Sequence, residues 1–87
     1  MRIHTYLQGG AFDGQLVTLL APEAKGEIRV AMSDDTDFSC GDVTVEVYSL
    51  IDVQQMPGMG SSHLQAGYRW VGSRKSAPSL VEYWIDV

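Results

Sequence analysis

Cysteine is nearly absent from this sequence: Cys40 is the single thiol among 87 residues. One thiol cannot close an internal disulfide, and a zinc site made of four cysteines is excluded. Long apolar runs are also missing, since no stretch approaches the ~18 residues that a membrane-spanning helix needs. Residues 1–20 lack the apolar segment of a secretory signal. We therefore expect a soluble protein that is made in the cytoplasm.

Positive charge is scarce as well. Lysine and arginine number 6 against 11 aspartates and glutamates, which gives a net charge of −5 and a pI near 4.6. Such a protein repels the phosphate backbone, so we expect no binding to nucleic acid. An apolar fraction of 45% is typical of a globular chain. Its length suits one domain, residues 1–87, whose core is small enough that a partner subunit would add stability.

Helical periodicity is the third absence, and alternation of apolar and polar residues takes its place. The alternation predicts six strands, at residues 2–8, 15–20, 27–32, 43–54, 64–72 and 80–87. The strand at 43–54 is the clearest, because β-branched residues of one parity dominate it, and Ser49 or Asp52 could mark a bulge. We predict an all-β domain, a small antiparallel barrel or sandwich of five to seven strands.

Glycines are concentrated in residues 9–15, Gly-Gly-Ala-Phe-Asp-Gly-Gln, between the first two predicted strands. The spacing fits neither a dinucleotide-binding fingerprint nor a phosphate-binding P-loop, and strand-like residues follow it. Glycine tolerates positive φ, and Asp-Gly is a favoured pair in hairpin turns. We predict a structural turn made by Gly9, Gly10, Asp13 and Gly14, with a ligand-binding loop as the alternative.

Residues able to do chemistry are few. The acidic segment 34–42 lacks the glycine and glutamate positions of an EF-hand, so we interpret it as a solvated loop rather than a calcium site. His4, His63 and Cys40 stand far apart in the sequence, and no spacing predicts that they meet. No catalytic serine or zinc-protease motif is present. We therefore expect no catalytic residue, no metal centre, no cofactor and no small-molecule substrate.

Aromatic residues gather in the last two predicted strands, as Tyr68, Trp70, Tyr83 and Trp84. Core packing explains most of them, a protein interface is the second interpretation, and base stacking is disfavoured by the negative charge. The segment 55–63 mixes methionine with glycine and serine, and methionine adapts to irregular surfaces. We predict six residues that contact a partner protein: Met56, Met59, Tyr68, Trp70, Arg74 and Trp84.

The N-terminal motif Gly9-Gly10-Ala11-Phe12-Asp13-Gly14, following Arg-Ile-His-Thr-Tyr-Leu-Gln, resembles one in small proteins of actinobacterial phages and prophages. Those proteins carry a first strand, then Gly-Gly-x-x-Asp-Gly, then a second apolar strand, and end in short tyrosine-rich strands. Ala11 departs from the proline usual at the third position of the motif. The resemblance covers about the first 20 residues and implies a phage setting, without any catalytic residue.

These observations favour a non-enzymatic phage protein that acts through protein–protein assembly. The leading hypothesis is a virion component, namely a minor capsid, decoration or head–tail joining protein that contacts capsid or connector subunits and associates with itself. The alternative is a small soluble inhibitor that binds a host enzyme or defence complex during infection. A ligand binder or enzyme that uses the glycine turn is the third hypothesis.

Overall fold

The computed structural model describes residues 1–33, 41–58 and 62–86. It contains β1 (Arg2–Gln8), η1 (Gly10–Phe12), β2 (Leu16–Leu20), β3 (Glu27–Met32), β4 (Val43–Gln55), β5 (His63–Ser76), η4 (Pro78–Leu80) and β6 (Tyr83–Ile85). Here η marks a single turn of 3₁₀-helix. Over these ranges there is no α-helix, and so none long and apolar enough to cross a membrane. The prediction of an all-β fold is confirmed.

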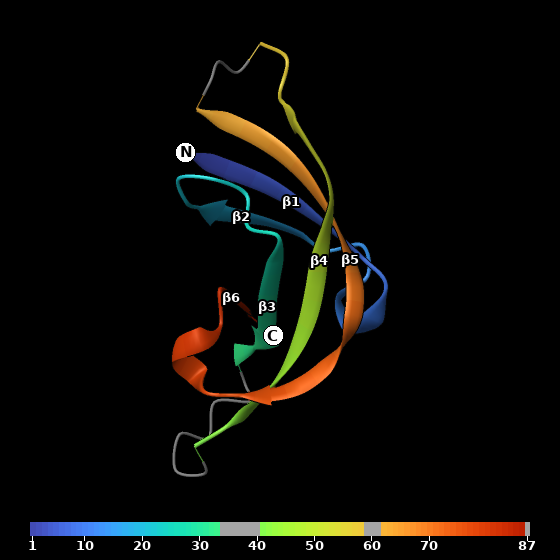
Figure 1. Cartoon of the computed structure of the whole chain (residues 1–87), viewed down its shortest axis with the longest axis vertical. Helices are drawn as coiled ribbons and strands as arrows, with labels where there is room; N and C mark the ends of the chain where they lie inside the picture. The colour runs from blue at the N-terminus through green and yellow to red at the C-terminus, as the bar shows by residue number, and fades with distance from the viewer. Residues whose placement is uncertain (34–40, 59–61, 87) are drawn as a thin grey trace.

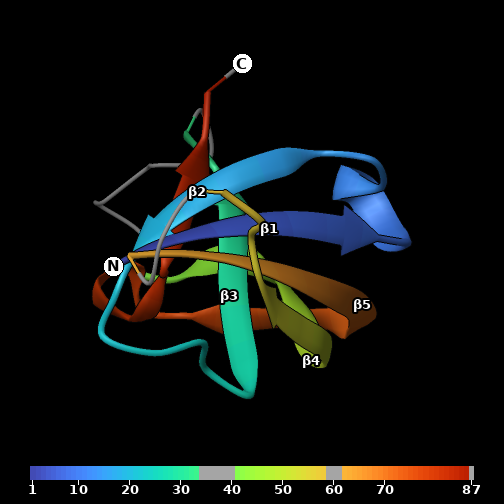
Figure 2. The ribbon, with the colours of Figure 1, turned by 90° about the horizontal axis from the view of Figure 1, so that it is seen from above.

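All six strands belong to one sheet in the order β2-β1-β5-β4-β3-β6. The sheet curls until it nearly closes into a barrel, with β2 and β6 as its two edges (Figure 1). Seen from above, β1 and β2 cross steeply over β3 on the other side of the core (Figure 2). Ile3 of β1 and Ile28 of β3 accordingly belong to the same buried cluster.

The expectation of a purely antiparallel sheet was wrong, because the sheet is mixed. β1 pairs with β5 in parallel, and β3 pairs with β6 in parallel, while the other three pairings are antiparallel. β1 and β2, which are consecutive in the chain, form a hairpin. The other edge of β1 pairs with β5, which lies far along the sequence. Alternation reports which face of a strand is buried and says nothing about which strand lies beside it.

Predicted strand limits hold near the N-terminus and fail near the C-terminus. β1 and β3 have the predicted limits, whereas β5 continues through residues 73–76, which were expected to form a loop. The long β4 strand supplies partners for this polar stretch, and tertiary pairing of this kind overrides local preference. β6 is only Tyr83–Ile85, because η4 occupies residues 78–80, where a strand was predicted to begin.

The first half of β4 is buried on both faces. Its valines of odd number, Val43, Val45 and Val47, join Ala31 in a small cluster against which Trp84 packs. Side chains of even number point to the opposite face, where Tyr48 enters the main cluster. That main cluster comprises Ile3, Leu7, Phe12, Ile28, Val30, Tyr48, Ala66 and Tyr68. The predicted apolar face of this strand therefore forms only the smaller of the two clusters.

Two irregularities bend the β4–β5 ribbon. Its register shifts between Val47 and Tyr48, where Val71 of β5 is the extra residue, and between Leu50 and Asp52, where Ile51 of β4 is the extra residue. A bulge increases the local twist, which lets the ribbon curve around the core (Figure 1). The sequence predicted a bulge or bend at Ser49 or Asp52, and the second shift adjoins Asp52.

Candidate interaction surface and seam pocket

The glycine-rich segment forms the connection between β1 and β2. Gly9, Gly10 and Gly14 have φ values of 84°, 69° and 84°, which place all three in the left-handed region. Asp13 Oδ1 accepts a hydrogen bond of 2.7 Å from the Gly9 amide. That bond occupies the carboxylate within the turn itself. The Asp13 amide donates to the Gly10 carbonyl at 3.4 Å, and the Gly14 amide donates to the Leu7 carbonyl at 2.8 Å. The four residues predicted to be structural therefore all take part in the connection between β1 and β2.

Trp70 covers this turn. A Cβ built on Gly10 would lie 2.4 Å from Trp70 Cδ1, so the indole rests directly on the glycine backbone. Trp70 Nε1 donates to Glu46 Oε1 at 3.1 Å, and the Ser73 hydroxyl donates to Glu46 Oε2 at 2.5 Å. Glu46 is 9% exposed, so these donors satisfy a nearly buried carboxylate. The predicted contact residue Trp70, although 40% exposed, therefore has a structural role at the turn.

Tyr68 is not available as a contact residue, and that part of the prediction was wrong. Its side chain is fully buried, and its hydroxyl donates to the Lys25 carbonyl oxygen. Tyr68 lies in the main cluster because it points to the same side of β5 as buried Ala66, two residues earlier. Trp84 is half-buried against the smaller cluster.

The other predicted contact residues do not come together. Met56 follows one end of the β4–β5 ribbon and is half-buried, whereas exposed Arg74 lies near the other end, opposite Val45. Met59 lies outside the described residues. The structure therefore does not gather the predicted set on one surface.

An apolar row crosses the outer face of four strands instead. Tyr6 of β1 stands opposite Leu16 of β2 on one side and opposite Gly67 of β5 on the other. Ile51, the extra residue of β4, lies 3.5 Å from the position that a Gly67 Cβ would take. Leu16 is 75%, Tyr6 41% and Ile51 44% exposed. We call Leu16, Tyr6 and Ile51 the outer row.

The sequence of β2 contains a signal for this row. Residues 16–20 of β2 read Leu-Val-Thr-Leu-Leu, and a strand so apolar on both parities cannot bury every side chain in a one-sided core. Leu20 is 77% exposed for the same reason. Tyr6 and Ile51 could not be assigned to the row without the register of β1, β5 and β4.

A pocket lies at the seam where the barrel fails to close. Its volume is about 410 Å³, within the range of small-ligand sites. One side is the end of β2, and the other is the segment between η4 and β6. Apolar lining comes from Ile3, Leu19, Ile28 and Val81, and charged lining from Glu23, Lys25, Arg29 and Glu82.

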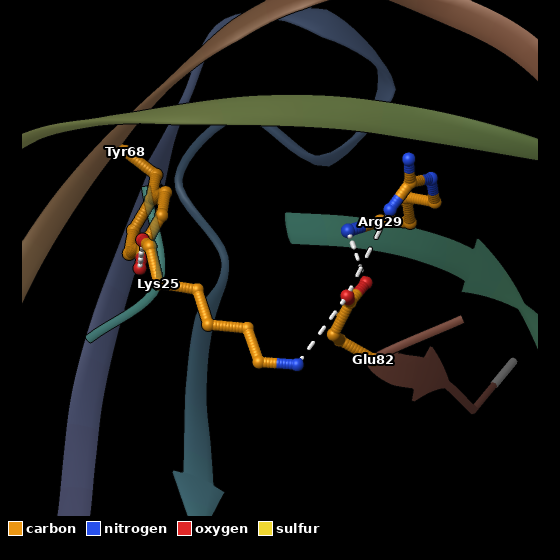
Figure 3. A network of polar contacts seen from close by, with 4 residues as sticks. All are labelled: Lys25, Arg29, Tyr68 and Glu82. Carbon is orange, nitrogen blue, oxygen red and sulfur yellow. Dashed lines mark hydrogen bonds and ion pairs between the residues drawn. The ribbon is translucent and has the colours of Figure 1, made fainter. Parts of the chain in front are cut away.

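Glu82 links the C-terminal side of this seam pocket to β3 and to the connection between β2 and β3 (Figure 3). Its Oε2 accepts from the Arg29 amide at 2.6 Å, and its Oε1 lies 3.8 Å from Lys25 Nζ and 3.9 Å from Arg29 Nη1. The Lys25 side chain is 57% exposed, so solvent screens that ion pair. The Glu82 amide in turn donates to the Arg29 carbonyl at 2.9 Å. This network holds the C-terminal segment against β3, and its carboxylate is occupied by structural donors.

Burial raises the pKa of Tyr68, and the nearby Glu82 carboxylate raises it further; burial also raises the pKa of Tyr48. In the unfolded chain these phenols ionise near pH 10, about their ordinary value. Above that pH the unfolded state loses its protons first. The stability that the two phenols contribute is thus complete below about pH 10 and is lost as the pH rises towards their folded pKa values.

We therefore expect the urea midpoint to be flat from pH 8 to about pH 10 and to fall steeply above it. Tyr68→Phe should reduce the fall of the urea midpoint above pH 10, when the midpoint of each protein is expressed relative to its own value at pH 8. Urea melts at half-unit pH intervals measure the slope directly. An unchanged slope in the variant would show that Tyr68 does not titrate with unfolding.

His4 and His63 lie side by side, contrary to the expectation that nothing brings them together. The parallel pairing of β1 and β5 sets Arg2 opposite His63 and His4 opposite Gln65, so the two imidazoles are diagonal neighbours on the outer face. His4 Nε2 is 2.9 Å from His63 Nδ1. Within the described ranges, no group of three or more histidine, cysteine, aspartate or glutamate side chains is placed to share a metal ion.

Of the acidic segment, Asp42 is described and exposed, while Asp34, Asp35, Asp37 and Cys40 lie outside the described residues. Among the described residues, the seam pocket, the outer row and the histidine pair are the candidate sites. Comparison with known proteins adds no assignment: no family model, no curated protein and no solved structure matches the chain.

Proposed function

We propose that this protein is a non-enzymatic binding protein that acts through protein–protein assembly, with the outer row as its contact surface. The observation that carries the proposal is the alignment of Leu16, Tyr6 and Ile51 across four strands, all well exposed. Well-exposed apolar side chains grouped on one face of a small protein are typical of an interaction site. Tyrosine is also enriched among the residues that dominate binding energy.

The sheet presents the outer row in a fixed geometry. Tyr6 and Leu16 are opposite each other in the β1–β2 ladder, and Ile51 is held over Gly67 by the bulge in β4. A partner would bind this surface without first ordering it, which lowers the entropic cost of association. His4, Gln65 and Arg2 lie beside the row on the same face and provide the polar rim that interfaces commonly have.

The phage setting of this proposal rests on the resemblance of the Gly9–Gly14 motif. A virion component would be a minor capsid, decoration or head–tail joining protein that binds capsid or connector subunits and copies of itself. The alternative is an inhibitor of a host protein, which the net charge of −5 would steer towards a basic surface. Both functions use a protein contact, and they differ in where the protein is found.

Quantitative mass spectrometry of purified particles, beside lysate of infected cells, separates these two functions. A head–tail ring requires a small symmetric number, about six or twelve copies per particle, and a capsid-lattice component requires hundreds. A host-directed inhibitor would be abundant in the lysate and absent from particles. That last result would exclude a virion component and leave the contact surface to be tested against host proteins.

The contact surface is tested by Leu16→Asp. We expect incorporation into particles, or capture of the partner, to fall by about tenfold or more, because a charge would be buried in the contact. The free energy of unfolding should change by no more than about 0.5 kcal/mol, since the side chain is exposed. Leu80→Asp is the matched control, because Leu80 is 54% exposed but belongs to the seam pocket. Equal binding by the two variants would exclude the outer row as the contact.

A further inference from the structure

The two histidines meet edge to edge. Their ring planes are 8° from parallel, and their centroids are 5.2 Å apart. The facing nitrogens, His4 Nε2 and His63 Nδ1, are 2.9 Å apart. The centroid separation exceeds the nitrogen separation by about the width of one imidazole ring, so both nitrogens lie on the line between the ring centres. The rings are therefore coplanar and joined head-on, and they are not stacked face to face.

This arrangement defines the chemistry of the facing nitrogens. In a head-on N–H···N bond one ring donates its proton, and the other directs a lone pair along the line between the rings. The accepting ring must be neutral, and a neutral imidazole nitrogen is the commonest metal ligand in proteins. When both rings carry their protons on the outer nitrogens, His4 Nδ1 and His63 Nε2, two lone pairs face the same point.

We propose that His4 and His63 form a binding site for a divalent transition-metal ion of the Cu²⁺, Ni²⁺ or Zn²⁺ class. The ligands are His4 Nε2 and His63 Nδ1, and water completes the coordination. With metal–nitrogen bonds of about 2.0–2.1 Å, tetrahedral coordination needs the nitrogens roughly 3.3 Å apart. The observed separation is 2.9 Å. Because the facing lone pairs point along the line between the rings, each ring must also turn by about 35° before both lone pairs meet one tetrahedral ion. This rotation and the small opening fall on the side-chain torsions of the two histidines, of which the terminal one is broad.

The sheet prepares this site. β1 and β5 are paired along Arg2–Gln8, so the two backbones that carry the imidazoles are fixed before any ion binds. Both histidines are half-buried on the outer face, which leaves a path for the ion and its waters. Gln65 stands opposite His4 on this face, and Arg2 stands opposite His63. The Arg2 charge opposes a cation, while the net charge of −5 favours one.

Isothermal titration calorimetry of the untagged full chain with CuCl₂, NiCl₂ or ZnCl₂ tests the proposal. We expect one ion per chain, with Cu²⁺ the tightest in accord with the general order for nitrogen ligands. His4→Gln and His63→Gln should each weaken binding by about tenfold or more, since each leaves a single imidazole. Both positions are on the outer face, and circular dichroism checks that the variants remain folded.

A gain-of-ligand variant makes the test independent of any loss of folding. Gln65→His places a third imidazole opposite His4 and should tighten binding by about tenfold or more. The double variant His4→Gln/His63→Gln measures binding by the amino terminus and the carboxylates. Binding by the double variant equal to that of the wild type would overturn the proposal, as would a Gln65→His variant with no gain. Loss in both single variants together with a gain in Gln65→His would establish the site.

Discussion

Gly10→Ala is expected to lower the free energy of unfolding by about 2–4 kcal/mol, because it adds a left-handed backbone penalty to a steric clash. Gly10 has a φ of 69°, and its new Cβ would lie 2.4 Å from Trp70 Cδ1 and 2.5 Å from Trp70 Cγ. The indole cannot retreat freely, since its Nε1 donates to Glu46. Urea unfolding followed by circular dichroism measures the loss, and Trp70 fluorescence should report the displaced ring.

Gly14→Ala is the matched control for this substitution. Gly14 has a φ of 84°, but nothing lies within 4 Å of its added Cβ, so it pays the backbone penalty alone. That penalty is about 1–2 kcal/mol. In a Trp70→Ala background the extra cost of Gly10→Ala should disappear, and the two glycine variants should cost the same. Equal costs in the wild-type background would show that the indole does not restrict Gly10.

Tyr48→Phe should destabilise the protein by about 1–3 kcal/mol, because it removes a hydroxyl and leaves two backbone groups without their hydrogen-bond partner. The Tyr48 hydroxyl donates to the Gly9 carbonyl at 2.7 Å and accepts from the Phe12 amide at 3.2 Å. Through these bonds the centre of β4 fixes the turn between β1 and β2. Hydrogen exchange of the Phe12 amide should therefore accelerate in the variant by more than global unfolding explains.

Tyr6→Phe provides the control, because it removes the same atom from an exposed ring. We expect its free energy of unfolding to stay within about 0.5 kcal/mol of the wild type. An equally small change in the free energy of unfolding for Tyr48→Phe would show that water replaces the lost hydroxyl and that the turn does not depend on β4.

Local patterns in the sequence were sufficient for much of the fold. β1 and β3 have the predicted limits because strict alternation marks both faces of a strand. The turn at Gly9–Gly14 was predictable because its glycines and aspartate are turn-forming residues, although Tyr48 and Trp70, which hold it in place, could not be assigned to it from the sequence. The parallel pairing of β1 with β5 was not predictable, because it depends on which apolar faces fit together across the whole chain.

The candidate sites depend on register, and this explains why sequence analysis missed them. His4 and His63 are 59 positions apart, and only the parallel β1–β5 ladder makes them neighbours. Ile51 has the parity of Val47, whose face lies away from the main cluster, and as the extra residue at a bulge it lies over Gly67. Tyr68 was assigned to the surface because an aromatic side chain looks the same in a core and in an interface.

The same parallel ladder has a consequence for the kinetics of folding. Arg2 pairs with His63, so the centre of the sheet closes a loop that spans most of the chain. Closure of that loop costs entropy before its contacts form, and proteins dominated by such distant pairings fold slowly. During synthesis one edge of β1 in the β1–β2 hairpin therefore stays unpaired until β5 has been made. If β5 of a neighbouring copy pairs with this edge first, the result is a domain-swapped dimer. Synthesis of several chains side by side on one mRNA would favour that product.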